Sequence, residues 1–255
     1  MRMLEALDRV PAVRAMRLSV RRSQTLRRAY FRMRLLRSKS ESDEIPIVSR
    51  LTRNVPRTFI EFGFHPVEFN CVELAKRRDW RGLLIDGNEE QVGDARSLWP
   101  DRIEAVHSFL TLDNLDFIRK QFPELGILSI DVDGNDYWFL KALIDLSPSL
   151  IIVEYNSTLG FEPITVPYDP SFARHDKHKL GWYHGASLTA LAKLCAEHGY
   201  GLAAGTDGSC NAFFTKNGDL RPEDVWKPKQ LRALLSGVPH EQQWDHIKHL
   251  PFVTV

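Results

Sequence analysis

The chain has 255 residues, of which 43% are hydrophobic and 26% charged, and its formal net charge is +1. This composition is typical of soluble globular proteins and excludes a collagen-like or wholly disordered chain. The three cysteines are odd in number and far apart, which argues against a disulfide framework or a cysteine-rich zinc site. No apolar stretch reaches the roughly 20 residues of a membrane span, and no secretory signal is recognisable, so a cytoplasmic protein is expected.

A strongly basic segment opens the chain. Residues 1–39 contain 12 Lys/Arg but only two acidic residues, so this segment carries +10 and the rest of the chain −9. Residues 11–37 are rich in helix formers and predict an amphipathic helix, with Leu26, Tyr30 and Met33 on one apolar stripe. Such a helix is typical of peptides that lie on an anionic membrane. Packing on the body or on a second subunit explains the same pattern, and nucleic acid is the less favoured partner. Residues 1–44 are interpreted as a basic arm and linker.

From residue 45 onward, short β-branched runs alternate with helical stretches. The centres of the first five runs recur every 21–24 residues, which is the length of a strand–helix–strand unit. Continuous apolar runs such as 150–153 indicate strands buried on both faces, as in a parallel sheet. The predicted strands are 58–63, 83–86, 103–110, 126–131 and 150–155, and the predicted helices between them are 67–78, 89–99, 112–122 and 137–146.

The remaining elements complete a doubly wound, Rossmann-like α/β domain over residues 45–220. A helix is expected over 186–198, followed by two strands, 200–204 and 211–216, that form an antiparallel hairpin at the edge of the sheet. The long irregular segment 156–184 follows the fifth strand and is expected to be a lid over the carboxyl ends of the strands. Residues 221–255 predict a tail of short helices that wraps the body or a neighbouring subunit.

The first two strands end in residues suited to a nucleoside ligand. Gly63 ends the first strand, where a glycine lets the backbone turn tightly and approach a ligand. Asp86 ends the second strand, where a carboxylate can accept hydrogen bonds from both hydroxyls of a ribose. The pair resembles a nucleoside-binding fingerprint, although the GxGxxG spacing is absent.

Acidic and amide side chains follow the fourth and fifth strands. Asp131 and Asp133 come at the end of the fourth strand and share a face, and Glu154 and Asn156 end the fifth. Oxygen atoms converging from adjacent strands suit a hard cation such as Mg²⁺, for which Asp131, Glu154 and Asn156 are the candidate ligands. Binding of a ligand's ammonium or hydroxyl groups, and simple turn and cap hydrogen bonds, are the alternatives.

Several of these segments together resemble a known family. The succession EFG, LLIDGN, SIDVDGNDYWFLKAL and IIVEYN, over about residues 57–216, is similar to the FkbM-like group of class I S-adenosylmethionine-dependent methyltransferases. The resemblance implies a seven-stranded sheet whose last strand is antiparallel. It also implies that the turn from Glu61 to Gly63 faces the methionine part of the cofactor, Asp86 the ribose, and His107 and Ser108 the adenine.

One position departs from the family pattern. His65 stands where the family usually has a second glycine, and a side chain there either obstructs the cofactor or points away from it. The leading hypothesis is an O-methyltransferase acting on a saccharide or glycolipid hydroxyl. The alternative is a non-catalytic methyltransferase-like module that is tethered through its basic arm, and the sequence leaves the oligomeric state open.

Methylation of a hydroxyl requires a group that removes its proton. Histidines of the segment 156–184 can serve, because imidazole is poised for proton transfer near neutral pH. Tyr155, Trp182 and Tyr183 can either line a sugar site or simply pack in the core. The candidate catalytic residues are Asp131, Asp133, Glu154 and His184, with His175 and His178 as further histidines of the same segment.

Overall fold

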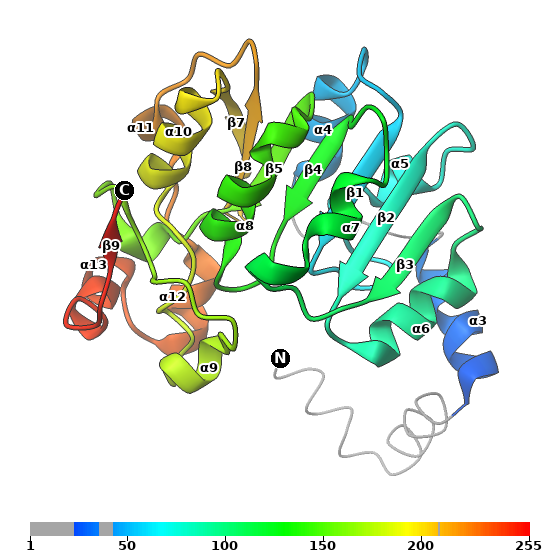
Figure 1. The fold of residues 1–255 in the computed structure, drawn as a ribbon. Helices are drawn as coiled ribbons and strands as arrows, with labels where there is room; N and C mark the ends of the chain where they lie inside the picture. The colour runs from blue at the N-terminus through cyan, green and yellow to red at the C-terminus, as the bar shows by residue number, and fades with distance from the viewer. Residues whose placement is uncertain (1–22, 36–42, 209) are drawn as a thin grey trace.

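The computed structural model describes residues 23–35, 43–208 and 210–255, and they form a central seven-stranded sheet with helices on both faces (Figure 1). The strand order is β3-β2-β1-β4-β5-β8-β7, in which β8 runs opposite to the other six strands. This is the topology of the class I methyltransferase fold, as expected. The strands are β1 (Thr58–Phe62), β2 (Arg81–Asp86), β3 (Ile103–His107), β4 (Ile127–Ile130), β5 (Leu150–Glu154), β7 (Gly201–Gly205) and β8 (Asn211–Thr215).

Alternating side chains of each strand enter two separate cores, which explains the continuous apolar runs. In β5, Ile151 and Val153 face one core, whereas Leu150 and Ile152 face the other. The first core is covered by α7 (Asp116–Arg119), α8 (Asp136–Leu143) and α10 (Leu188–Glu197). The second core is covered by α4 (Glu44–Leu51), α5 (Val72–Ala75) and α6 (Glu89–Leu98).

Two of the expected helices are much shorter in the structure. The helix expected over 67–78 is reduced to α5, because the preceding residues form a turn in which His65 and Glu68 exchange backbone hydrogen bonds. The buried carboxylate of Glu61 then accepts hydrogen bonds from the backbone N–H groups of Asn70 and Cys71, which fixes where α5 begins. The helix expected over 112–122 is likewise divided into a 3₁₀ turn (Leu112–Asn114) and α7.

The expected lid and the C-terminal tail pack together. Within residues 156–184 lie the 3₁₀ turn η3 (Ser157–Leu159), the short strand β6 (Ile164–Thr165) and α9 (Arg174–Lys177). β6 pairs antiparallel with β9 (Val253–Thr254), and apolar side chains of both segments form a third hydrophobic cluster. The tail also contains α11 (Pro222–Val225), α12 (Gln230–Ser236), α13 (His240–Gln243) and η4 (Trp244–His246).

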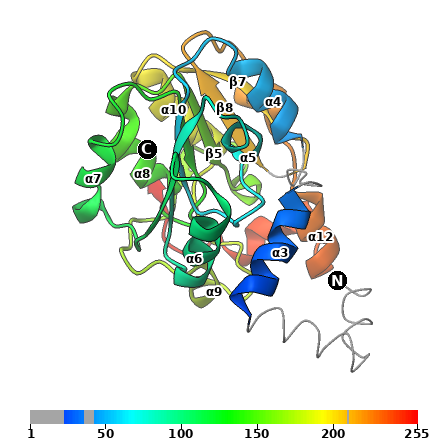
Figure 2. The same ribbon diagram turned by 90° about the vertical axis from the view of Figure 1, so that its right-hand side faces the viewer.

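The described part of the basic arm is docked on the body. α3 (Gln24–Leu35) packs beside α6 (Figure 2), where Phe31 is buried and Arg27 forms an ion pair with Asp94. Residues 11–22 and 36–37 of the helix expected over 11–37 lie outside the described residues. None of the described helices is long and apolar enough to cross a membrane.

Truncating the buried aromatic of α3 should release this helix without unfolding the sheet. We expect Phe31→Ala to speed amide hydrogen exchange across α3 by about tenfold or more, because the substitution removes a buried apolar anchor worth on the order of 2 kcal/mol. Exchange in β1, β4 and β5 should not change. Tyr30→Ala is the matched control, since Tyr30 is an exposed aromatic on the same helix. Equal effects of the two substitutions would show that Phe31 does not anchor α3.

Candidate functional site

The main cavity lies at the carboxyl ends of β1, β2 and β4. Its volume is about 530 Å³, within the range typical of small-molecule sites. Residues at the ends of four strands, β1 to β4, therefore meet residues of the lid segment at one place. The lining includes Gly63, Asp86, Asn88, Ser108, Phe109, Asp131, Asp133, Asn135 and Phe172.

Gly63 brings the ends of β1 and β4 into close contact. Its φ of +67° lies in the left-handed region, and a Cβ atom here would lie 1.6 Å from the backbone oxygen of Asp131. Any other residue would therefore push the two strand ends apart. The predicted role of this glycine in a tight turn agrees with this geometry.

Asp86 is placed at the cavity by hydrogen bonds from two loops. One carboxylate oxygen accepts from the backbone N–H of Asn88 at 2.6 Å, and the other from that of Phe64 at 3.1 Å. Burial raises the pKa of Asp86 above its ordinary value, whereas these hydrogen bonds lower it. Ser108 lines the cavity, whereas His107 is exposed and its Nε2 lies 3.0 Å from the backbone oxygen of Gly87. Phe109, which the sequence reasoning missed, lines the cavity and is 61% exposed.

His65 does not enter the main cavity. Its ring packs edge-on against Phe31 of α3, and its Nδ1 accepts a hydrogen bond from the backbone N–H of Val67. Together with Glu61, it lines a smaller side cavity of about 160 Å³ that shares Gly63 and Asp131 with the main one. Because the imidazole lines only this side cavity, it does not block the main cavity next to Gly63. Burial raises the pKa of Glu61, which lines the same side cavity, to about 7.

The acidic side chains after β4 are held in three different ways. Asp136 is buried, and its two oxygens accept hydrogen bonds from the backbone N–H groups of Val132 and Gly134. Asp133 is exposed, has a positive φ of 57° and forms an ion pair with Arg174 of the lid segment. Asp131 lines both cavities, and its pKa is raised well above the ordinary value by burial and by the neighbouring carboxylates of Glu154, Asp136 and Asp133.

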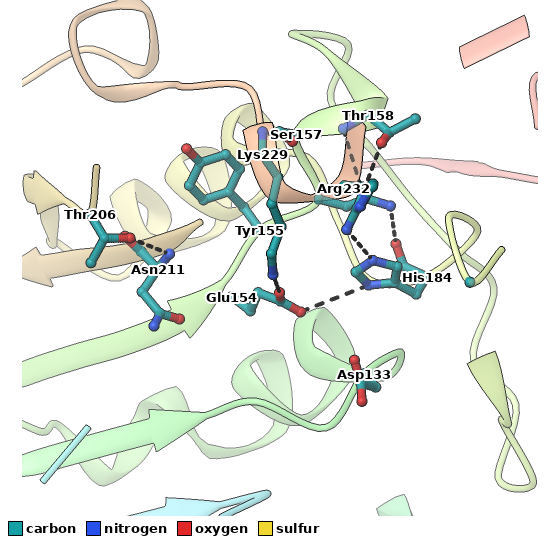
Figure 3. Close-up of polar contacts among 12 residues, drawn as sticks. Asp133, Glu154, Tyr155, Ser157, Thr158, His184, Thr206, Asn211, Lys229 and Arg232 are labelled. Atoms are coloured by element: carbon teal, nitrogen blue, oxygen red, sulfur yellow. Dashed lines mark hydrogen bonds and ion pairs between the residues drawn. The ribbon is translucent and has the colours of Figure 1, made fainter. Parts of the chain in front are cut away.

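Two cations from the C-terminal tail reach the end of β5 (Figure 3). The ammonium of Lys229 lies 2.9 Å from Oε1 of Glu154. Burial lowers the pKa of Lys229, but the interactions with Glu154 and Cys210 together outweigh this effect, and the net shift is upward. Arg232 is buried and donates hydrogen bonds to Oδ1 of Asn156 and to Oγ1 of Thr158, both at 2.7 Å. The sequence reasoning missed both cations, because it assigned no chemistry to the tail.

His184 lies between the tail and Glu154. Its Nε2 is 3.0 Å from Nη2 of Arg232, and its Nδ1 is 3.9 Å from Oε2 of Glu154. The pKa of His184 is well below its ordinary value because the ring is buried and several cations, Arg174 and Arg232 first among them, lie nearby. The imidazole is therefore neutral at physiological pH.

The acidic cluster at the ends of β4 and β5 is poorly suited to a divalent metal ion. Asp133, Glu154 and His184 each bring a ligand atom within 4.8 Å of the others, which is a spacing that an ion can bridge. However, Lys229 and Arg232 already place two positive charges at this cluster. The predicted ligand Asn156 is also committed, because its Oδ1 accepts from Arg232 and from the backbone N–H of Thr158. The geometry therefore argues against the predicted Mg²⁺ site of Asp131, Glu154 and Asn156.

The other aromatic and histidine candidates do not form an open sugar site. Tyr155, Trp182 and Tyr183 are all buried, so they pack in the cores. His178 packs against Trp182 and accepts a hydrogen bond from its backbone N–H, and His175 is exposed on α9. Of the lid histidines, only His184 joins the acidic cluster.

Comparisons with known proteins give remote structural similarities. No protein-family model matches the sequence, and no curated protein matches it. The N-terminal domain of EvdMO1 with SAH bound is 12% identical, with a TM-score of 0.47 over 72% of this chain and 82% of that one. A putative O-methyltransferase from Klebsiella pneumoniae is 16% identical, with a TM-score of 0.42 over 69% and 78%. M. capricolum TrmK in complex with S-adenosylhomocysteine is 12% identical, with a TM-score of 0.42 over 74% and 80%. Because these scores are low, the fold assignment depends on the strand order described above.

Replacing Asp131 by a residue that cannot ionise should stabilise the protein most at alkaline pH. The pKa of Asp131 is raised in the folded protein. At pH values between its pKa in the unfolded state and its pKa in the folded state, the carboxyl is protonated only in the folded state. Its contribution to stability is therefore lost as pH rises through this window. We expect the unfolding free energy of Asp131→Asn, relative to wild type, to increase by about 1 kcal/mol or more from pH 5 to pH 8 in urea titrations.

Asp101→Asn is the control for this experiment, since Asp101 is exposed on the surface. Its effect on the unfolding free energy should be the same at both pH values. If Asp131→Asn lowered the unfolding free energy equally at pH 5 and pH 8, the prediction would be contradicted. Such a result would show that Asp131 is ionised in the folded protein at both pH values.

Proposed function

We propose that the protein is an S-adenosylmethionine-dependent O-methyltransferase of the FkbM-like group and that its acceptor is a hydroxyl of a saccharide or glycolipid. The observation that carries this proposal is the cavity of about 530 Å³ where β1, β2 and β4 end. It combines a backbone turn at Gly63 with a carboxylate at Asp86, the two features that the sequence predicts for a nucleoside ligand. The side chain of His65, which sequence reasoning marked as a potential obstruction, lies outside this cavity.

The residues of the cavity fit the parts of this cofactor. Asp86 is placed to accept hydrogen bonds from ribose hydroxyls, and the exposed ring of Phe109 offers a face on which a purine can stack. Glu61, Glu68 and Asp131 line the side cavity, and an ammonium group bound there would favour the ionised forms of these carboxyl groups. The bound cofactor would supply a methyl group that is already activated on a sulfonium, so the protein chiefly positions the acceptor.

The acceptor hydroxyl is proposed to lie beside the cluster of Asp133, Glu154 and His184. Asp133 lines the main cavity, and its carboxylate lies close to the ligand atoms of the other two residues. Asp131, from which the sequence also predicts catalysis, has a raised pKa and is better suited to donating a hydrogen bond than to removing a proton. Glu154 is the stronger candidate for the group that receives the proton of the hydroxyl.

A peripheral contact of residues 11–37 with an anionic membrane belongs to the same proposal. In α3 the apolar side chains of Leu26, Tyr30 and Met33 are exposed, and so are Arg28 and Arg32. An exposed stripe of this kind, flanked by arginines, is suited to the interface of an anionic bilayer.

We expect the double variant Leu26→Ser, Met33→Ser to sediment with phosphatidylserine-containing vesicles at least threefold less than wild type. Unchanged sedimentation would contradict a role of α3.

Isothermal titration of the purified protein with S-adenosylhomocysteine tests the cofactor site. We expect a dissociation constant of about 100 μM or tighter, which corresponds to roughly 5.5 kcal/mol. If no binding of S-adenosylhomocysteine is detected at ligand concentrations of about 100 μM, the methyltransferase function would be rejected and the alternative of a non-catalytic module favoured.

A substitution at the rim of the cavity tests its assignment to the adenine. We expect Phe109→Ala to weaken binding of S-adenosylhomocysteine by about 10-fold to 100-fold, because stacking of a base on an aromatic ring contributes on the order of 1–3 kcal/mol. The melting temperature should not change, since the ring is largely exposed. Phe117→Ala on α7 is the matched control, because Phe117 is an exposed phenylalanine that does not line the cavity. Equal affinities of the two variants would place the adenine elsewhere.

A further inference from the structure

Arg232 is the one buried residue of α12. The leucines of the same helix, Leu231, Leu234 and Leu235, are exposed, with Leu234 exposed to 80%. An amphipathic helix normally buries its apolar side chains and exposes its cations. α12 is therefore anchored through the polar contacts of its arginine with Thr158 and His184 (Figure 3) and with Asn156.

The contact between Arg232 and His184 determines which ring nitrogen carries the proton. A guanidinium has only N–H donors and no acceptor. Nε2 of His184, 3.0 Å from Nη2 of Arg232, must therefore accept the hydrogen bond through its lone pair. In a neutral imidazole the proton is then on Nδ1.

The Nδ1–H group of His184 and the Oε2 atom of Glu154 face each other across a gap. They are 3.9 Å apart, which is too long for a hydrogen bond between them. Within the described part of the chain, neither atom has a hydrogen-bond partner, although His184 is 1% and Glu154 6% exposed. Unpaired buried polar atoms are costly, and a donor and an acceptor in this arrangement are both satisfied by one oxygen atom that can accept and donate a hydrogen bond.

The position of the proton on Nδ1 of His184 favours a hydroxyl group over a metal ion between His184 and Glu154. A metal ion would need the lone pair of Nδ1, and the proton would then have to move to Nε2, where it would face the N–H donor of Arg232. A hydroxyl oxygen meets no such conflict, because it accepts from Nδ1–H and donates to Oε2. Lys229 holds the other oxygen of Glu154, so that Oε2 remains available.

We propose that Arg232 is a positioning residue that fixes the tautomer of His184, and that His184 and Glu154 thereby form a binding site for one hydroxyl group beside the cofactor cavity. The proposal that this hydroxyl belongs to the methyl acceptor depends on the proposed function. Asp133 connects the two sites, since it lines the cavity and lies within 4.8 Å of the ligand atoms of the pair. When the acceptor is absent, we expect a water molecule to take the position of this hydroxyl.

Long-range ¹H–¹⁵N NMR of the imidazole nitrogens tests the tautomer in the protein without cofactor. His184→Gln identifies the signals of His184 by their loss. We expect a neutral ring at pH 7.5 with its proton on Nδ1, the opposite of the tautomer that free histidine prefers. A proton on Nε2, or a doubly protonated ring, would overturn the proposal, and neither result depends on whether the protein binds S-adenosylhomocysteine.

Removing the guanidinium of Arg232 should allow the ring of His184 to adopt both neutral tautomers. In Arg232→Met we expect a substantial fraction of His184 to shift its proton to Nε2. Arg174→Met is the matched control, because Arg174 is a second cation near His184 that binds Asp133 and the backbone of Gly181 instead of the ring. It should leave the tautomer unchanged. Equal spectra of the two variants would contradict a specific role of Arg232, and the wild-type spectrum remains decisive if Arg232→Met does not fold.

Crystals grown with S-adenosylhomocysteine distinguish the two sources of the hydroxyl. Without further ligand, we expect one water oxygen within hydrogen-bond distance of both Nδ1 and Oε2. Soaking with a panel of methyl glycosides should replace this water by a sugar hydroxyl. Water retained with every glycoside would overturn the acceptor role for saccharides, and direct contact between Nδ1 and Oε2 would overturn the site itself. Failure of S-adenosylhomocysteine to bind would reject the proposed function alone, since the tautomer is measured separately.

Discussion

The arrangement of this site depends on how the protein accommodates carboxyl groups at the carboxyl edge of β4 and β5. An isolated carboxylate in a buried position is strongly unfavourable, so each one needs a hydrogen-bond donor, a cation or a proton. Asp136 uses backbone N–H groups, Glu154 uses Lys229, and Asp131 holds its proton more tightly than usual, because burial and the neighbouring carboxylates raise its pKa. These different solutions give neighbouring acids different chemical properties, and different properties are what a catalytic site requires.

This constraint explains why the lid segment and the C-terminal tail form one unit. The compensating cations are Arg174 in the lid and Lys229 and Arg232 in the tail, all far along the chain from the strands that carry the acids. The pairing of β6 with β9 and the third hydrophobic cluster hold the two segments together. Packing far from the cavity thus maintains the charge balance beside it.

Local patterns in the sequence were sufficient for the sheet and for part of the site. The regular spacing of apolar runs predicted the first five strands of the large sheet, and two further runs predicted its hairpin. Gly63 and Asp86 could be placed near one another because a strand–helix–strand unit brings its strand ends to one edge. The helix expected over 67–78 was wrong over most of its length. Its apolar residues do pack in the core, but the Glu61 carboxylate binds the backbone at Asn70 and Cys71, a contact that no periodicity reveals.

The sequence predicted short helices in the tail but could not show that the tail contributes to the site, because this role depends on which face of α12 meets the body. A helix with one arginine among leucines normally predicts an apolar face turned inward, and here the arginine is inside. The inversion follows from the partner surface, which offers Asn156 Oδ1, Thr158 Oγ1 and the lone pair of His184 as acceptors. A buried guanidinium is tolerated only where such acceptors are already in place. The orientation of α12 is therefore set by the polar end of β5, and through it the tail becomes part of the site.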